Sequence, residues 1–227
     1  MMPARVYSTV RGVARLVFTD RADGDFAGDG DPSRCAAQVS ALADLSWTWV
    51  NQVHGGDVLV VEEPGGGCGS RADGLVTSVP AAMLTVRGAD CPLVGLVSPQ
   101  GVVAVAHAGW RGLVAGVLPR TVEVMRAQGA LEITAVLGPC ITASVYEFGS
   151  VDLDEAVAAL GPSVRAQTAQ RRPALNLVAG VVASLGSCGV AVDLESHRCT
   201  AGDDSLYSHR ARGDRGRHLA AVWLEEP

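Results

Sequence analysis

Residues 92–112 read PLVGLVSPQGVVAVAHAGWRG, and this stretch decides the fold that the sequence predicts. Residues 92–98 and 101–107 are apolar runs of strand length, and the Pro-Gln-Gly sequence between them is typical of a turn. The second run ends at His107, after which the chain changes to small residues, a tryptophan and an arginine. The stretch therefore predicts two strands and places a histidine at the end of the second one.

On both sides of this stretch, segments of strand length are mixed with helical segments without strict alternation. Residues 19–34 are rich in glycine and aspartate and predict a loop, and the N-terminal third as a whole reads as irregular. Strands are predicted at residues 58–63, 74–78, 82–88, 132–140, 190–196 and 217–225, and helices at 36–45, 113–129, 150–160 and 175–189. Pro119 is expected to kink or split the second helix, and an N-cap signature begins the third. We therefore predict one α+β domain over residues 1–227, in which mixed β-sheets carry helices on their outer faces.

The bulk composition is that of a globular chain and excludes several classes of function. The 227 residues are 48% hydrophobic and 19% charged, and the formal net charge of −6 argues against nucleic-acid binding. No apolar stretch approaches the ~20 residues of a membrane span, and the N-terminus lacks the apolar core of a signal peptide. We expect a cytoplasmic monomer or homodimer with a small-molecule substrate and no membrane partner.

The basic and thiol side chains restrict the chemistry further. All 18 basic residues are arginine, which excludes Schiff-base, pyridoxal-phosphate and P-loop lysine chemistry. Any anion must therefore be bound by arginine and backbone N–H groups. The six cysteines form no CxxC pair, so each is expected to be a small packed side chain unless its neighbours indicate otherwise.

Three segments place a metal-binding side chain where the backbone changes conformation: NQVHGGDV (51–58), RGADCPL (87–93) and the segment that ends at His107. Two imidazoles and one thiolate, from His54, Cys91 and His107, would make a three-ligand zinc set with the fourth position open to water. Zinc lowers the pKa of bound water from ~16 towards 7. Their spacing matches no local zinc-finger pattern, and an isolated histidine or cysteine of this kind is more often simply packed.

The same residues support a second interpretation without a metal. Cys91 would act as the nucleophile, His107 or His54 as its base, and Asp90 or Asn51 as the group that orients the base. This arrangement predicts a thiol-dependent hydrolase or amidase. The residue types alone leave both interpretations open.

Six segments in a fixed order resemble the YfiH family, from about residue 50 to the C-terminus. They are NQVHG, ADGLVT (72–77), ADCPL, AHAGWRG, GPCI…YEFG (138–149) and CT…YSHR…GR (199–217). The family is also called the laccase-domain or multicopper polyphenol oxidase family and the peptidoglycan editing factor family.

This resemblance implies that the sheets and helices form a layered α+β sandwich, related in fold to the catalytic domain of cytotoxic necrotising factor. It also implies a zinc ion held by His54, Cys91 and His107. The implied activity is phosphorolysis of adenosine, inosine, guanosine and methylthioadenosine to the base and ribose 1-phosphate, together with adenosine deamination. The older family label is copper-dependent phenol oxidation, but five histidines in the whole chain are too few for a multicopper cluster.

Further residues are candidates for contact with the reacting groups. Asp90 and Asp73 are the carboxylates nearest to the ligand segments, and Asp90 would either move a proton or orient a ligand. Arg87 and Arg111 could bind phosphate through bidentate forks. Asp73 is also a candidate for substrate binding.

Gln52, in the first segment, and Tyr146, which the resemblance places near the cavity, complete the predicted substrate set. Trp110 could stack on a base, although a tryptophan after a strand is more often core. His209 and His218, flanked by arginines, are expected in a solvated basic segment that could line a pocket.

The N-terminal region departs from the family pattern. FTDRADG (18–24) resembles the family's glycine-rich segment only loosely, and the helix that follows lacks the usual Asn-Arg pair. Arg21 or Arg34 would have to replace that arginine if it binds phosphate.

Three classes of function follow from these observations. The leading prediction is a zinc-dependent purine nucleoside enzyme. The alternatives are an editing amidase that acts on a peptidoglycan precursor through Cys91 or a zinc-bound water, and a binding protein without catalytic activity.

Overall fold

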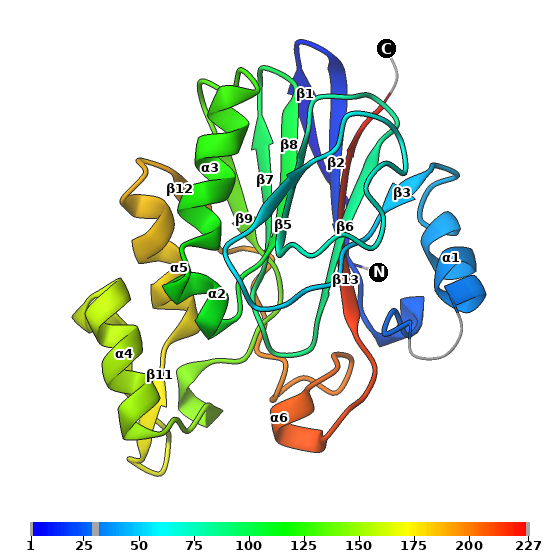
Figure 1. The fold of residues 1–227 in the computed structure, drawn as a ribbon. Helices are drawn as coiled ribbons and strands as arrows, with labels where there is room; N and C mark the ends of the chain where they lie inside the picture. Colours follow the sequence, from blue (N-terminus) through cyan, green and yellow to red (C-terminus); the bar gives the residue numbers. More distant parts are fainter. Residues whose placement is uncertain (1, 29–31, 226–227) are drawn as a thin grey trace.

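Two β-sheets packed face to face form the centre of the protein in a computed structural model, which describes residues 2–28 and 32–225 (Figure 1). The first sheet has five strands in the order β1-β2-β13-β6-β3. Their bounds are β1 Arg5–Thr9, β2 Gly12–Phe18, β13 His218–Leu224, β6 Met83–Gly88 and β3 Trp47–Thr48. All neighbours are antiparallel except β3 and β6.

The second sheet has six strands in the order β12-β9-β7-β8-β5-β4. Their bounds are β12 Ala191–Asp193, β9 Thr134–Leu137, β7 Leu93–Ser98, β8 Val102–His107, β5 Gly74–Thr77 and β4 Val58–Val60. The outer pairs β12–β9 and β4–β5 are parallel, and the inner pairs are antiparallel. The mixed sheets predicted from the sequence are therefore confirmed.

The side chains of β8 alternate between two apolar layers, one on each face of the six-stranded sheet. Val103 and Val105 lie in the apolar layer between the two sheets. Val102, Ala104 and Ala106 lie in the layer that the helices cover. Because successive strand residues point to opposite faces, a strand buried on both sides reads as a continuous apolar run, as residues 101–107 do.

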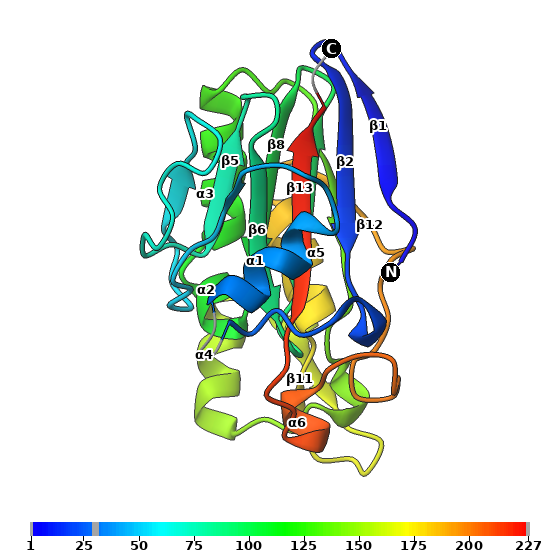
Figure 2. The same ribbon diagram turned by 90° about the vertical axis from the view of Figure 1, so that its right-hand side faces the viewer.

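Helices cover the outer faces of both sheets, as the sequence predicts (Figures 1 and 2). The six-stranded sheet carries α2 Trp110–Val114, α3 Val117–Ala127, α4 Ser150–Leu160 and α5 Leu177–Gly186. The five-stranded sheet carries α1, Pro32–Ser40. The smaller elements are α6 His209–Arg212, the β10 Arg165–Gln167 and β11 Pro173–Leu175 pair, and 3-10 turns at Arg21–Asp23, Ala143–Val145 and Pro162–Val164. In the part of the chain that is described, no helix combines the length and apolar character needed to cross a membrane.

The N-terminal region is more regular than predicted. β1 and β2 form an antiparallel hairpin, and the helix expected at residues 36–45 instead spans Pro32–Ser40. The strand β1 alternates between half-buried and exposed residues, so it lacks the apolar run by which strands such as β7 and β8 are recognised.

Two predicted helix details are also corrected. The helical region 113–129 breaks at Gly116, which adopts the left-handed conformation at φ 80°, and not at Pro119. Pro119 lies in the first turn of α3, where no N–H donor is needed within the helix. The N-cap of α4 is Gly149, and Ser150 is the first helical residue.

Candidate active site

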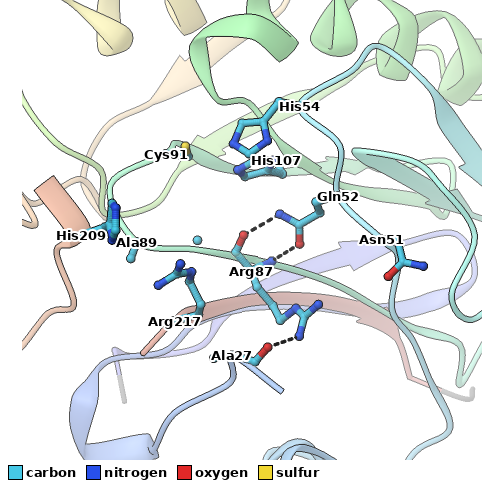
Figure 3. A pocket seen from close by; sticks show the side chains of 11 residues that line it. Ala27, Asn51, Gln52, His54, Arg87, Ala89, Cys91, His107, His209 and Arg217 are labelled. Atoms are coloured by element: carbon cyan, nitrogen blue, oxygen red, sulfur yellow. Dashed lines mark hydrogen bonds between the residues drawn. The ribbon is translucent and has the colours of Figure 1, made fainter. Parts of the chain in front are cut away.

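His54, Cys91 and His107 come together at one end of the sandwich, with one ligand atom of each within 4.8 Å of the others (Figure 3). The three residues come from the loop between β3 and β4, the loop before β7, and the end of β8. The two imidazole rings meet edge to face, with centroids 4.8 Å apart. This is the one group of three or more histidine, cysteine or acidic side chains with metal-binding geometry among the described residues.

The strand register explains why residues distant in sequence meet here. Leu93 of β7 pairs with His107 of β8, so Cys91, two residues before Leu93, lies beside the end of β8. The backbone is unusual in both loops. His54 itself has φ 57°, and Asp90, the residue before Cys91, has φ 90°. Left-handed conformations of this kind in non-glycine residues cluster at functional sites because they cost free energy that only a constrained structure maintains.

Asp73 connects two of the three ligands. Its carboxylate, which is fully buried, accepts a hydrogen bond from His107 Nδ1 at 2.8 Å. It also accepts the backbone N–H groups of Val53, His54 and Gly55 at 3.1, 3.1 and 2.8 Å. Burial disfavours the carboxylate, but the hydrogen bonds from His107 and Gly55 outweigh it and lower the pKa of Asp73. Since Nδ1 of His107 donates to this carboxylate, Nε2 is the nitrogen available to a metal ion.

Cys91 and His107 polarise each other. Burial opposes ionisation of the Cys91 thiol, but His107 and His54 lower its pKa. Burial also opposes protonation of His107, but Cys91 and Asp73 raise its pKa. In the absence of an ion, the pair therefore favours thiolate and imidazolium, and the thiolate is the form that binds metals.

Gly109 gives the three ligands room to approach. A Cβ atom at this position would lie 2.9 Å from His54 Cδ2 and 3.1 Å from Cys91 Sγ. Its φ of −57° is accessible to any residue, so the lack of a side chain matters here because of space.

Asp90, the predicted acid, points away from the three ligands. Its buried carboxylate accepts hydrogen bonds from the Thr200 and Ser208 hydroxyls at 2.6 and 2.7 Å and from the Arg210 N–H at 2.6 Å. Its backbone carbonyl accepts the N–H of Ile141 at 2.9 Å. These contacts attach the Cys91 loop to the C-terminal segment.

A cavity of about 450 Å³ lies beside the three ligands, and we call it the metal cavity. It is lined by Ala27, Asn51, Gln52, His54, Arg87, Gly88, Ala89, Cys91, His107, His209 and Arg217 (Figure 3). Arg87 and Arg217 are the arginines in this lining, and they come from strand β6 and from the residue before β13. A cavity of this size, with a few converging polar groups, is typical of small-ligand sites.

Gln52 and Arg87 are joined through the backbone. The Gln52 side chain accepts the Arg87 N–H at 2.8 Å and donates to the Arg87 carbonyl at 2.6 Å. The Arg87 guanidinium donates from Nη1 to the carbonyls of Ala27 and Phe26 at 2.6 and 3.3 Å. Gln52 therefore fixes the end of β6, and Arg87 closes one side of the cavity against the loop that contains Ala27.

The other predicted arginines lie elsewhere. Arg111 is exposed and its guanidinium lies 4.3 Å over the ring of Trp110, which packs edge to face on Phe148 in the helical core. Neither lines the metal cavity. Arg21 forms an ion pair with Asp214, and the side chain of Arg34 is outside the part of the chain that the structure describes.

Tyr146 is buried next to the site without lining the cavity. The guanidinium carbon of Arg210 lies 4.6 Å from the centre of its ring, and the ring of Phe148 lies 5.3 Å away, tilted by 52°. Burial and the nearby Cys91 raise the pKa of Tyr146 to about 12. Its phenol therefore stays protonated at neutral pH.

The C-terminal segment contains one histidine that lines the cavity, one that does not, and an arginine that was not predicted from the sequence. His209 lines the metal cavity, whereas His218 is buried within β13 and is not solvated. Arg217 was not identified as a site residue, although it ends the last of the six motif segments. That motif was the available signal.

Comparison with known proteins identifies the family of the chain. The family described as multi-copper polyphenol oxidoreductase laccase matches residues 24–225. A Mycobacterium tuberculosis protein named as a purine nucleoside phosphorylase is 39% identical over 224 residues, which cover 94% of this chain and 88% of the relative. The crystal structure of protein NMB0706 from Neisseria meningitidis has a TM-score of 0.84 at 25% identity, covering 98% and 99% of the two chains. The Bacillus licheniformis protein YfiH has the same fold, with a TM-score of 0.80 at 23% identity and 93% of both chains covered. The chain thus belongs to the multi-copper polyphenol oxidoreductase laccase family, the YfiH family that its six sequence segments resemble.

Proposed function

We propose that this protein is a zinc-dependent purine nucleoside phosphorylase, which converts a purine nucleoside and phosphate to the free base and ribose 1-phosphate. The observation that carries the proposal is the His54–Cys91–His107 group beside a cavity with two arginines. The name of the 39% identical relative supports the same activity. The proposed substrates are adenosine, inosine, guanosine and methylthioadenosine.

Zinc is the metal that best fits the donor set. Two imidazoles and a thiolate are the ligands that zinc prefers, and three protein ligands are typical of catalytic zinc sites. The buried carboxylate of Asp73 behind His107 is the supporting contact expected of such a site. Bound zinc would act there as a Lewis acid. The multicopper chemistry in the family's name would need several copper centres, and the described residues form one group of three ligands.

The residues of the cavity then take distinct roles in the proposal. Arg87 and Arg217 bind phosphate, since each guanidinium keeps N–H donors beyond those bonded to backbone carbonyls. Gln52 positions Arg87, and Asp73 positions His54 and His107. Asp90 positions the Cys91 loop, and Tyr146 supports it from behind. Arg111 has no role in the cavity in this proposal.

Adenosine deamination is the second activity that we propose for this site. The release of ammonia from adenosine requires water and a proton donor at the purine carbon that carries the amine, without phosphate. The open position of the three-ligand group supports this activity.

Incubation of the zinc-loaded protein with adenosine, with and without phosphate, tests both activities. Adenine and ribose 1-phosphate in equal amounts, formed only with phosphate, support phosphorolysis, and inosine formed without phosphate supports deamination. If adenosine, inosine, guanosine and methylthioadenosine all remain unchanged, the proposed function is wrong.

One observation favours a second candidate function, a thiol amidase that edits a peptidoglycan precursor. The lowered pKa of Cys91 beside a protonated His107 is the arrangement of a cysteine nucleophile with its base. Such an enzyme would hydrolyse a peptide amide after metal removal and lose activity on thiol alkylation. The phosphorylase would instead lose its activity when the metal is removed.

A further inference from the structure

A second cavity, of about 520 Å³, adjoins the metal cavity, because Ala27, Asn51 and Arg87 line both. We propose that this second cavity, which we call the tryptophan chamber, binds the purine ring of the nucleoside while phosphate occupies the metal cavity. The rest of its lining is formed by Gly28, Cys35, Ala36, Trp47, Trp49 and Cys68. This inference rests on the proposed function and assigns a place to the base within that site.

The position of the tryptophans follows from strand alternation. Trp47 and Trp49 are two residues apart, so their side chains point to the same face of the extended segment that begins with β3. Thr48 between them points the other way, is fully buried, and donates to the Gly66 carbonyl at 3.0 Å. Trp47 pairs in register with Met83 of β6, whose side chain lies in the core under α1. Both indoles therefore lie on the outer face of the five-stranded sheet, on the side of α1.

The chemistry of the tryptophan chamber suits a planar, uncharged ring. Both indoles are half-buried and line the chamber together with thiols and small side chains. Among the residues that the structure describes, Arg87 is the one charged residue in its lining, and no carboxylate of these residues lines it. Purine rings stack on tryptophan, as nucleic-acid bases do on the aromatic side chains of proteins that bind single strands.

The order of the two cavities matches the geometry of the reaction. In phosphorolysis an oxygen of hydrogen phosphate forms a bond to C1′ of the ribose as the bond from C1′ to the purine nitrogen breaks. The purine leaves with that electron pair, and the proton of the hydrogen phosphate ends on the base. An in-line displacement needs the nucleophile and the leaving group on opposite sides of C1′. Arg217 and the metal ligands line only the metal cavity, and the indoles line only the tryptophan chamber. The ribose would therefore lie at their junction, beside Asn51 and Arg87, which line both.

Free adenine is the probe that tests the chamber without catalysis. We expect adenine to quench the tryptophan fluorescence of the zinc-loaded protein. We expect Trp49→Leu and Trp47→Leu each to weaken adenine binding about tenfold, and Trp49→Phe to restore most of the affinity. The matched control is Trp223→Phe, because Trp223 is also in the core under α1 but lines neither cavity. Circular dichroism identifies any variant that fails to fold.

Steady-state kinetics give the second readout. The Trp49→Leu variant should raise the KM for adenosine about tenfold and leave the KM for phosphate unchanged. An unchanged adenine affinity in folded Trp47→Leu and Trp49→Leu overturns the inference, as does a change in the phosphate KM alone. If the wild-type protein binds adenine through these tryptophans but cleaves no nucleoside, the chamber assignment stands and the proposed function fails.

Discussion

The Asp73 carboxylate accepts a hydrogen bond from His107 Nδ1 at 2.8 Å, while the Asp73 carbonyl accepts the backbone N–H of His107 at 2.7 Å. The two residues are thus joined twice, once through the side chains and once through the main chain. The same carboxylate accepts the His54 N–H, so one buried acid sets the position of two metal ligands.

The Asp73→Asn variant should weaken zinc binding about 10- to 100-fold and reduce activity in proportion. The amide has a single acceptor oxygen for the four donors that the carboxylate now accepts, so it cannot hold His107 and the His54 loop together. Competition with a chelator measures the affinity. Asp57→Asn is the control, because Asp57 lies in the same loop as His54 and its side chain is exposed. Equal zinc affinity in the two variants would contradict the role given to Asp73.

The Cys91→Ser variant should lose the bound zinc, because a serine hydroxyl is a far weaker zinc ligand than a thiolate. Metal analysis after dialysis should find about one zinc ion per wild-type chain and almost none in the variant. Cys188→Ser, which changes a half-buried cysteine outside the ligand group, should keep its zinc. Full zinc content in Cys91→Ser would show that the ion binds elsewhere.

The Gly109→Ala variant should fold normally and lose most of its zinc affinity and activity. The new Cβ would be 2.9 Å from His54 Cδ2, and His54, which is exposed, would be pushed out of the group. Gly149→Ala is a close match as control, since Gly149 is also the N-cap of a helix at negative φ and has open space around it. A thermal scan and chelator competition on both variants separate loss of the site from loss of the fold. Normal zinc affinity in Gly109→Ala would be inconsistent with this geometry.

The Arg217→Gln variant should raise the KM for phosphate at least tenfold, because hydrogen bonds to a charged partner are worth about 1.5–3 kcal/mol each. The KM for adenosine should change little. Arg215→Gln, two residues away, alters an exposed arginine that does not line the cavity and should behave as the wild type. An unchanged phosphate KM in Arg217→Gln would remove this residue from the phosphate site.

The buried His218 predicts a loss of stability in mild acid. Burial lowers its pKa in the folded protein, although the Tyr207 carbonyl, 3.2 Å from its Nε2, favours the protonated ring. The unfolded chain therefore binds more protons between the lowered value and about 6.5, the ordinary pKa of histidine. The contribution of His218 to the free energy of unfolding is thus complete above about pH 6.5 and decreases as the pH falls below it.

The measurement is the change in Tm between pH 7.5 and pH 5.5. This change should be smaller in His218→Gln than in the wild type, whatever the Tm of the variant at pH 7.5. His209→Gln, which alters an exposed histidine, should keep the wild-type change. The same change in all three proteins would show that folding does not lower the pKa of His218.

Much of the fold follows from local patterns in the sequence. The strands β7 and β8 are recognised from residues 92–107 because both are buried on two sides and read as apolar runs. The hairpin of β1 and β2 was not recognised, because its edge strand β1 exposes every second residue and carries few apolar side chains. Local pattern also fails at Gly116, where one left-handed residue ends α2 and begins α3.

The sequence likewise predicts some residues of the candidate site and not others. The sequence predicts the group of His54, Cys91 and His107, which could hold a metal ion, because each residue lies in a distinctive motif. Arg217 ends a motif segment but was missed, because its place beside the cavity depends on the pairing of β13 with β6, in which His218 is opposite Gly88 and Leu219 opposite Arg87. That pairing brings together residues about 130 positions apart, and no local pattern specifies such a contact.

The strand β13 lies in the interior of the five-stranded sheet, between β2 and β6, although it follows every other strand in the chain. During synthesis on the ribosome, β2 and β6 would therefore have no permanent neighbour between them until residues 218–224 emerge. A nascent or prematurely terminated chain would present two unpaired strand edges to chaperones, to proteases or to other copies of itself.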